Sequence, residues 1–518
     1  MIKRILYLPA FIGYVIHILW HLGKESHSAF QDDMRQHILG LYHLSDFFGR
    51  YFSATVPLGI DWLNQVTSLF MTPLTWARWV QPIFIALLLT FFSWRLGKKF
   101  FLGGKAEKKI FLFVILLQAL IWSGDDLISS TPRSWAILCV VALLDASLSR
   151  QVLRLIITLF LTALFYPPLA ITGFGLFVLL QLDIFLFQKK NPLYGSNILL
   201  VIAILVGLYG MAHDQSRHLD DYGPRITKKE ARVLPEFNLG GRAHYFSDDI
   251  LDFWVTNSRG GLLPKDAQAA AMLLVLGLLL GLNKNSFQKL KEDRRVFWIS
   301  GLFLGSLVLF FLAHAFWFRL FHPNRYIQFV IPVVACLVAT QFFSKIKFVL
   351  FVLPPVLFFF NHALSNQSYY HEEEALFIKS KMAKELSPSL AVFPVSKLGE
   401  ALPLLEQLPI VASEELSLPY HRAFYQKAQE RLADTYSLWI TTNENEVVHY
   451  FEKYQVTHIL LEREAWQGKT KLSEPWQSLY HKKLVSESSS LLKQVLGKDK
   501  KKFLSKVEFF REMKQPSF

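Results

Sequence analysis

Two pairs of adjacent aspartates are the residues whose type and spacing best suit chemistry in this sequence. Asp32 and Asp33 form the first pair, and Asp125 and Asp126 form the second. Carboxylate oxygens are preferred ligands of Mg²⁺ and Mn²⁺. Such a cation can neutralise a phosphate leaving group, and a carboxylate without a cation can act as general base. We therefore predict Asp32 and Asp33 as catalytic, and Asp33, Asp125 and Asp126 as ligands of a divalent cation.

Each aspartate pair also has a plainer interpretation. Asp32 or Asp33 is a suitable N-cap for a helix that begins at Met34. Aspartates in a loop are in most cases simply solvated. The chemical interpretation depends on both pairs lying on the same side of the protein.

Three basic residues are candidates for binding a phosphate. Arg133 follows Thr131-Pro132, a typical helix start, and His322 and Arg325 flank Pro323-Asn324. The planar guanidinium group matches phosphate geometry. The alternative is that these side chains only anchor helix ends at an interface.

Apolar runs of helical length separate these motifs. Hydrophobic residues make up 52% of the 518 residues, and charged residues only 19%. A membrane span needs about 20 mostly apolar residues. The candidate spans, about eleven, are Ile5–Leu22, Trp79–Leu96, Ile110–Trp122, Ser134–Leu148, Val152–Phe165, Leu169–Phe187, Ile198–Ala212, Ala267–Leu282, Phe297–Phe318, Ile327–Phe343 and Phe348–Leu364.

The distribution of charge is consistent with such spans. The formal net charge is +14. Lys and Arg gather in alternate connections, as the positive-inside rule predicts, so orientation in a membrane explains them better than nucleic-acid binding. We predict a cytoplasmic N-terminus and both aspartate pairs on the opposite face.

The composition changes after Leu364. Residues 365–518 are polar, with strand-like runs at Leu390–Val395, Ile410–Ala412 and Thr457–Leu461, and helical patterns at Pro419–Tyr436 and Asn445–Tyr454. The basic tail beyond Lys498 predicts a flexible end. We predict two domains, a transmembrane domain over 1–364 and an extracytoplasmic α/β domain over 365–518.

This layout resembles the GT-C glycosyltransferases, which include oligosaccharyltransferase catalytic subunits and protein O-mannosyltransferases. It also resembles a group of bacterial membrane proteins. The stretches that carry the second resemblance are Asp32–His37, Pro132-Arg133-Ser134, Gly240-Gly241-Arg242, Asn324-Arg325-Tyr326, and Glu414 with Pro419-Tyr420. The WWDYG acceptor motif is absent, and its nearest counterpart is Asp220-Asp221-Tyr222-Gly223.

The resemblance implies a polytopic α-helical, GT-C-like membrane protein with a C-terminal extracytoplasmic α/β domain. It implies a glycosyltransferase in the bacterial inner membrane that moves a sugar from a polyprenyl-phosphate-linked donor to an acceptor of unknown identity. Arg325 is then a candidate for the donor phosphate. The alternatives are a non-catalytic scaffold of cell-envelope glycan synthesis and, ranked lower, a transporter.

Overall fold

The computed structural model describes most of the chain. The described residues are 47–48, 51, 57–103, 106–122, 131–188, 222–264, 267–268, 270–275, 294–316, 322–343, 378–380, 389–461, 470–486, 490–498 and 508–511. Among them helices predominate, and the strands form one small sheet.

The chain divides into two compact units. Unit 1 comprises Met1–Ser26, Val56–Gln215 and Asp248–Gln367, and unit 2 comprises His27–Thr55, Ser216–Ser247 and Ser368–Phe518. Unit 2 therefore draws on three separate stretches of the sequence.

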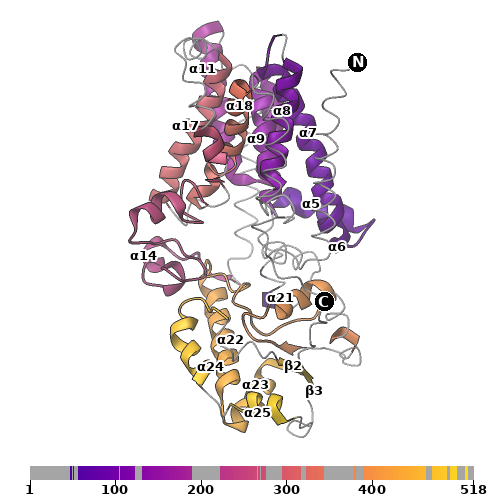
Figure 1. Ribbon diagram of the computed structural model, residues 1–518, viewed down its shortest axis with the longest axis vertical. Helices are drawn as coiled ribbons and strands as arrows, with labels where there is room; N and C mark the ends of the chain where they lie inside the picture. Colours follow the sequence, from indigo (N-terminus) through magenta and orange to yellow (C-terminus); the bar gives the residue numbers. More distant parts are fainter. Residues whose placement is uncertain are drawn as a thin grey trace. The chain divides into compact units, whose positions relative to one another are not determined.

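Unit 1 is a bundle of helices (Figure 1). Its helices are α5 (Leu58–Ser68), α6 (Pro73–Thr75), the π-helical turn η1 (Trp76–Val80), α7 (Gln81–Phe100), α8 (Ala106–Trp122), α9 (Arg133–Leu148), α10 (Val152–Phe165), α11 (Pro167–Gln188), η3 (Asp252–Thr256), α17 (Arg294–Ala315), η4 (Pro323–Tyr326) and α18 (Val330–Phe343).

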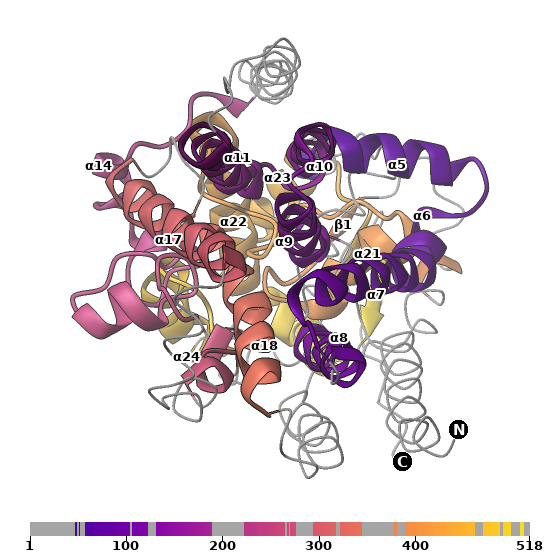
Figure 2. The ribbon, with the colours of Figure 1, turned by 90° about the horizontal axis from the view of Figure 1, so that it is seen from above.

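The helix α9 forms the centre of the bundle. It packs against α7, α10, α11, α17 and α18, and it is buried along most of its length. Figure 2, viewed along the bundle, shows its neighbours around it. Its sequence is apolar on all sides, which is typical of a helix enclosed by others.

Side-chain contacts fix which helix ends lie together. Lys99, near the end of α7, contacts Asp145, near the end of α9, and Gln81 at the start of α7 donates to Ser134 at the start of α9. Arg295, at the start of α17, donates to the carbonyl of Phe100 over 2.5 Å. The bundle therefore has two ends, which we name the Asp145 end and the Arg325 end after the residues described below.

The predicted polytopic, GT-C-like fold with about eleven spans is wrong. In the part of the chain that the structure describes, one helix is long and apolar enough to cross a membrane, at Arg295–Ala315. Three other apolar helices are shorter, at Val152–Phe165, Pro167–Leu180 and Val330–Gln341. The error has a physical reason, because an apolar run of 10 to 16 residues suits a buried core helix as well as a span. The predicted spans at Ile5–Leu22, Ile198–Ala212 and Phe348–Leu364 lie outside the described residues.

Unit 2 combines helices with a parallel sheet. Its elements are α14 (Lys228–Ala231), η2 (Pro235–Phe237), β1 (Leu390–Ala391), α21 (Lys397–Glu406), α22 (Arg422–Ile440), α23 (Glu444–Tyr454), β2 (His458–Leu461), η6 (Gln477–His481), α24 (Lys482–Ser486), α25 (Leu491–Lys498) and β3 (Glu508–Arg511). The strand order is β1-β2-β3, with Ile459 aligned to Ala391 and to Phe509.

Local chemistry explains where the helices of unit 2 begin and end. The Asn443 side chain accepts from the Asn445 amide at the start of α23, and Gln455 ends that helix in the left-handed conformation, with φ of 49°. Parallel strands need a helical crossover, and α21, α22 and α23 occupy the stretch between β1 and β2. Buried aromatic side chains of α22 and α23 pack with β2 in the core.

Candidate functional site

The predicted phosphate-binding residues lie at one end of unit 1. Arg133 begins α9, and Arg325 lies in η4, which directly precedes α18. The ring of Phe165 stacks on Trp135 at 4.3 Å, and the next residue, Tyr166, places its ring 5.4 Å from Phe329. These contacts connect the start of α9 to the start of α18, so Arg133, His322 and Arg325 share the Arg325 end.

A loop beside η4 adds a fourth basic residue to the Arg325 end. The Asn324 amide nitrogen donates to the carbonyl of Ser258 over 2.6 Å, and the backbone N–H of Asn324 donates to the carbonyl of Arg259 over 3.3 Å. The Asn257 side chain caps this loop by accepting from the N–H groups of Arg259 and Gly260, both at 2.9 Å. Arg259 is thereby held next to the turn that carries Arg325.

The conformation of this loop depends on its glycine and on a buried histidine. A Cβ at Gly261 would lie 2.5 Å from the carbonyl oxygen of Val255, so only glycine fits. The Nε2 atom of His314 lies 2.9 Å from the carbonyl oxygen of Gly260. Rings of Phe253, Trp254 and Phe310 surround that imidazole. His314 is thus a packing residue that positions the loop.

Several buried polar atoms at the Arg325 end have no hydrogen-bond partner among the described residues. Among them are Oδ1 of Asn324 and Nε1 of Trp135. An unpaired buried polar atom costs about 1–3 kcal/mol, and such atoms in a native fold call for an explanation. The first can accept a hydrogen bond from a ligand hydroxyl, and the second can donate one.

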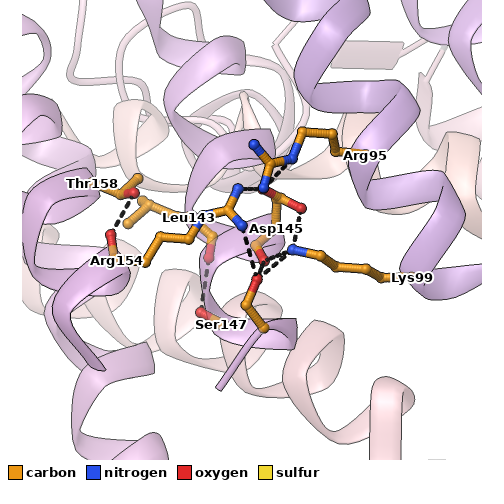
Figure 3. A network of polar contacts seen from close by, with 8 residues as sticks. Arg95, Lys99, Leu143, Asp145, Ser147, Arg154 and Thr158 are labelled. Carbon is orange, nitrogen blue, oxygen red and sulfur yellow. Dashed lines mark hydrogen bonds and ion pairs between the residues drawn. The ribbon is translucent and has the colours of Figure 1, made fainter. Parts of the chain in front are cut away.

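The opposite end of the bundle holds an ion-pair network that was not predicted from the sequence (Figure 3). The carboxylate of Asp145 is fully buried and pairs with Lys99, Arg154 and Arg95. The Lys99 ammonium lies 2.5 Å from Asp145 Oδ1, and Arg154 donates to Oδ2. In the sequence, this network is indicated by a single aspartate in an apolar helix and by basic residues in two neighbouring turns.

Unit 2 contains a second set of buried carboxylates, Glu236 and Glu414. Tyr425 donates its hydroxyl to Glu236, and Tyr436 donates to Glu414. Both tyrosines lie on α22, eleven residues or three turns apart, and therefore on one face. Ser473 donates its backbone N–H to Glu414 over 3.0 Å.

Burial shifts the pKa of Glu414 and of the two tyrosines. It raises the pKa of Glu414, while the hydrogen bonds from Ser473 and Tyr436 and the charge of Arg242 act in the opposite direction. Burial and the charge of Glu414 raise the pKa of Tyr436 well above its ordinary value. These tyrosines therefore act as fixed hydrogen-bond donors.

The backbone of Gly240-Gly241-Arg242 packs closely against the backbone of the segment that carries Glu236. Gly240 has φ of 84°, and a Cβ at Gly241 would lie 2.3 Å from the carbonyl oxygen of Glu236. Arg242 then pairs with Glu415. The glycines and the arginine of this motif are thus explained by the packing of unit 2.

The predicted catalytic and metal residues are not among those that the structure describes. Asp32, Asp33, Asp125 and Asp126 are outside the described residues. Within the described part of the chain, no group of three or more His, Cys, Asp or Glu side chains is arranged to hold a metal ion. A cation site made from the aspartate pairs stays a prediction.

No family model matches this chain, and no curated protein matches it.

Proposed function

We propose that this protein transfers a sugar from a polyprenyl-phosphate-linked donor to an acceptor, and that the donor phosphate binds at the Arg325 end of unit 1. The observation that carries the proposal is the grouping of Arg325, Arg133 and Arg259 with the buried Asn324 Oδ1 and Trp135 Nε1 atoms, which have no partner among the described residues. A guanidinium group recognises phosphate, while the Asn324 carbonyl and the Trp135 indole suit hydroxyl groups of a sugar.

Arg325 is the residue best suited to the phosphate. It is half-buried and has no ion pair or hydrogen bond with another described side chain. Its backbone is fixed because the neighbouring Asn324 is buried and hydrogen-bonded to the Ser258 carbonyl. A positively charged group on a rigid turn loses little conformational entropy when an anion binds.

Exposed apolar helix faces support an amphiphilic donor and a location at a membrane. The apolar side chains repeat every three or four residues, so they form continuous stripes. The exposed members are Ile83, Phe84, Leu87, Phe91 and Trp94 on α7, Leu153, Ile157 and Leu161 on α10, and Leu304, Val308, Phe311 and Leu312 on α17. A polyprenyl chain or lipid hydrocarbon can cover such stripes.

The proposed reaction breaks the bond between the anomeric carbon and the donor phosphate oxygen. The acceptor hydroxyl forms the new glycosidic bond, its proton passes to a carboxylate that acts as general base, and polyprenyl phosphate leaves. Arg325 stabilises the negative charge that develops on the leaving phosphate. A divalent cation at the leaving phosphate would add to that stabilisation.

The alternative is a non-catalytic scaffold of envelope glycan synthesis. The buried carboxylates of unit 2 favour a structural role for that unit, because tyrosine and serine donors already engage them. The two proposals differ in whether a sugar leaves its lipid.

A sugar-release assay tests the proposal. The full chain in nonionic detergent receives polyprenyl-phosphate hexoses that are radiolabelled in the sugar, and loss of label from the lipid fraction is measured. We expect release by the wild type and about 100-fold slower release by Arg325→Gln. Lys98→Gln, which removes an exposed charge at the Asp145 end, serves as the charge-matched control and should be unchanged. Release by Arg325→Gln at the wild-type rate would contradict the role of Arg325.

A further inference from the structure

The Asp145 network carries more positive than negative charge. Three basic side chains converge on one carboxylate, which leaves two positive charges in excess. The side chains of Arg95, Lys99 and Arg154 are 38%, 27% and 22% exposed, whereas that of Asp145 is 0% exposed. The buried carboxylate thus holds the basic groups together (Figure 3), and the basic groups are the solvent-exposed part of the network.

The three basic side chains differ in the hydrogen bonds that they donate to Asp145 and Ser149. Lys99 donates to Asp145 and Ser149, and Arg154 donates to Asp145 and, over 3.2 Å, to Ser149. The Nε of Arg95 lies 3.7 Å from Asp145 Oδ2, which is too long for a hydrogen bond. Among the described residues, the guanidinium donors of Arg95 therefore make no hydrogen bond, and the guanidinium group lies over the Phe91 ring at 5.4 Å.

The surroundings of the network add further positive charge. Exposed Arg150 flanks the network on the turn before α10. Arg295 reaches the same end through its hydrogen bond to the Phe100 carbonyl. An anion that bound here would neutralise like charges that otherwise repel one another.

Apolar stripes begin directly at this cluster. On α7, Phe91 and Leu87 lie one and two turns before Arg95, and all three share a face. On α10, Leu153 and Ile157 are exposed on either side of Arg154 in the sequence. A ligand that fits this arrangement has an anionic head and a long apolar tail.

We infer that Arg95, Lys99 and Arg154 bind the headgroup phosphate of an anionic phospholipid, with Asp145 as the positioning residue and with acyl chains along α7 and α10. Basic groups between helix ends are suited to phospholipid headgroups. This inference goes beyond sugar transfer and does not depend on it, since it concerns the opposite end of the bundle.

Native mass spectrometry of the full chain in nonionic detergent tests this inference. The protein is titrated with phosphatidylglycerol, and in parallel with phosphatidylcholine, while inorganic phosphate is added as a competitor in a third series. Arg95→Gln is the test variant because Arg95 makes the loosest contact with Asp145. Lys98→Gln is the matched control on the same turn, and thermal unfolding of both variants verifies that they fold.

The expected result is one retained phosphatidylglycerol that Arg95→Gln binds about tenfold more weakly, with less than a twofold change for Lys98→Gln. Equal losses in both variants would overturn the inference, because they would indicate non-specific attraction of charge. Equal retention of phosphatidylcholine would also overturn it. Full displacement by millimolar inorganic phosphate would identify a free phosphate ion, in place of a lipid, as the ligand.

Discussion

Hydrogen bonds from single hydroxyl groups stabilise the buried carboxylates of unit 2. Glu414 is buried and accepts from Tyr436 and from both the backbone N–H and the hydroxyl of Ser473. Removal of one donor leaves a buried acceptor without one of its hydrogen bonds. The resulting loss of stability is larger than the net contribution of an ordinary hydrogen bond.

We expect Tyr436→Phe to destabilise unit 2 by about 1–3 kcal/mol. The measurement is hydrogen exchange of α22 peptides in the full chain, because exchange localises the loss to this unit. Tyr480→Phe is the control, since Tyr480 is half-buried and its hydroxyl makes only a long contact, 3.5 Å, with the Ala433 carbonyl. Equal protection in the wild type and in Tyr436→Phe would show that the Glu414 contact contributes nothing.

Gly241→Ala is expected to disrupt the turn that carries Arg242. The added Cβ would lie 2.3 Å from the Glu236 carbonyl oxygen, so the backbone must move. Gly175→Ala in α11 meets nothing within 4 Å and should be neutral or up to about 1 kcal/mol stabilising. Thermal unfolding of both variants gives the comparison, and a Gly241→Ala protein as stable as wild type would refute the packing argument.

Residue types predicted part of the candidate site. Arg133, His322 and Arg325 were identified from their positions at helix starts, and the structure places all three at one end of unit 1. Arg259 was missed because its loop contributes through backbone contacts with Asn324, which leave no pattern in the sequence. The partners of Asp145 were missed because they come from two other helices.

At the scale of elements, the short helix α14 depends on a capping box. The Thr227 side chain accepts from the Glu230 amide, and the Glu230 carboxylate accepts from the Thr227 amide over 2.8 Å. Glu230 also pairs with Arg422, at the start of α22. Hydrogen bonds from Thr227, then from Arg422, lower the pKa of Glu230 to about 2.

This pKa predicts an acid-sensitive contact. A carboxylate whose folded pKa is depressed stabilises the fold above its unfolded pKa of about 4.5, and that stabilisation disappears as pH falls through about 2. In hydrogen exchange of residues 225–233, Glu230→Gln should therefore exchange faster than wild type at pH 5.5, with the difference shrinking toward pH 2. Glu444→Gln, in the first turn of α23, is the control. A difference that did not change with pH would contradict the assignment.

The bounds of helices and strands were predicted better than the contacts that each of them makes. The pattern for Val152–Phe165 coincides with α10, and Thr457–Leu461 differs from β2 by one residue. Ile410 forms only an isolated bridge to Leu390, and β3 lies in the tail that was predicted to be flexible. The periodicity of an apolar helix does not reveal what covers it, so the expectation of about eleven spans failed while the helices themselves were found.

At the scale of the whole molecule, exposed apolar stripes lead to a prediction about lipid contact. Val308 lies in the middle of α17 and is 57% exposed. A carboxylate there should oppose insertion among lipid chains by about 2.5–3.5 kcal/mol. We expect Val308→Glu to reduce the fraction of protein that floats with phosphatidylcholine vesicles in a density gradient.

The matched control for this flotation measurement is Val448→Glu. Val448 is 42% exposed on α23 of unit 2, which carries no comparable apolar stripe among its described residues. It should float as the wild type does. If Val308→Glu also floats like the wild type, α17 does not contact lipid.

The central claim, that the Arg325 end binds the phosphate of a lipid-linked donor, is tested most directly by equilibrium binding. The full chain in nonionic detergent is titrated with a fluorescent polyprenyl phosphate, and wild type, Arg325→Gln and Lys98→Gln are compared. We expect saturable binding of one ligand to the wild type. Arg325→Gln should bind about tenfold more weakly, which is a loss of about 1.4 kcal/mol in binding free energy. Lys98→Gln should bind within twofold of the wild type. Absence of saturable binding, or equal affinity in Arg325→Gln and wild type, would contradict it.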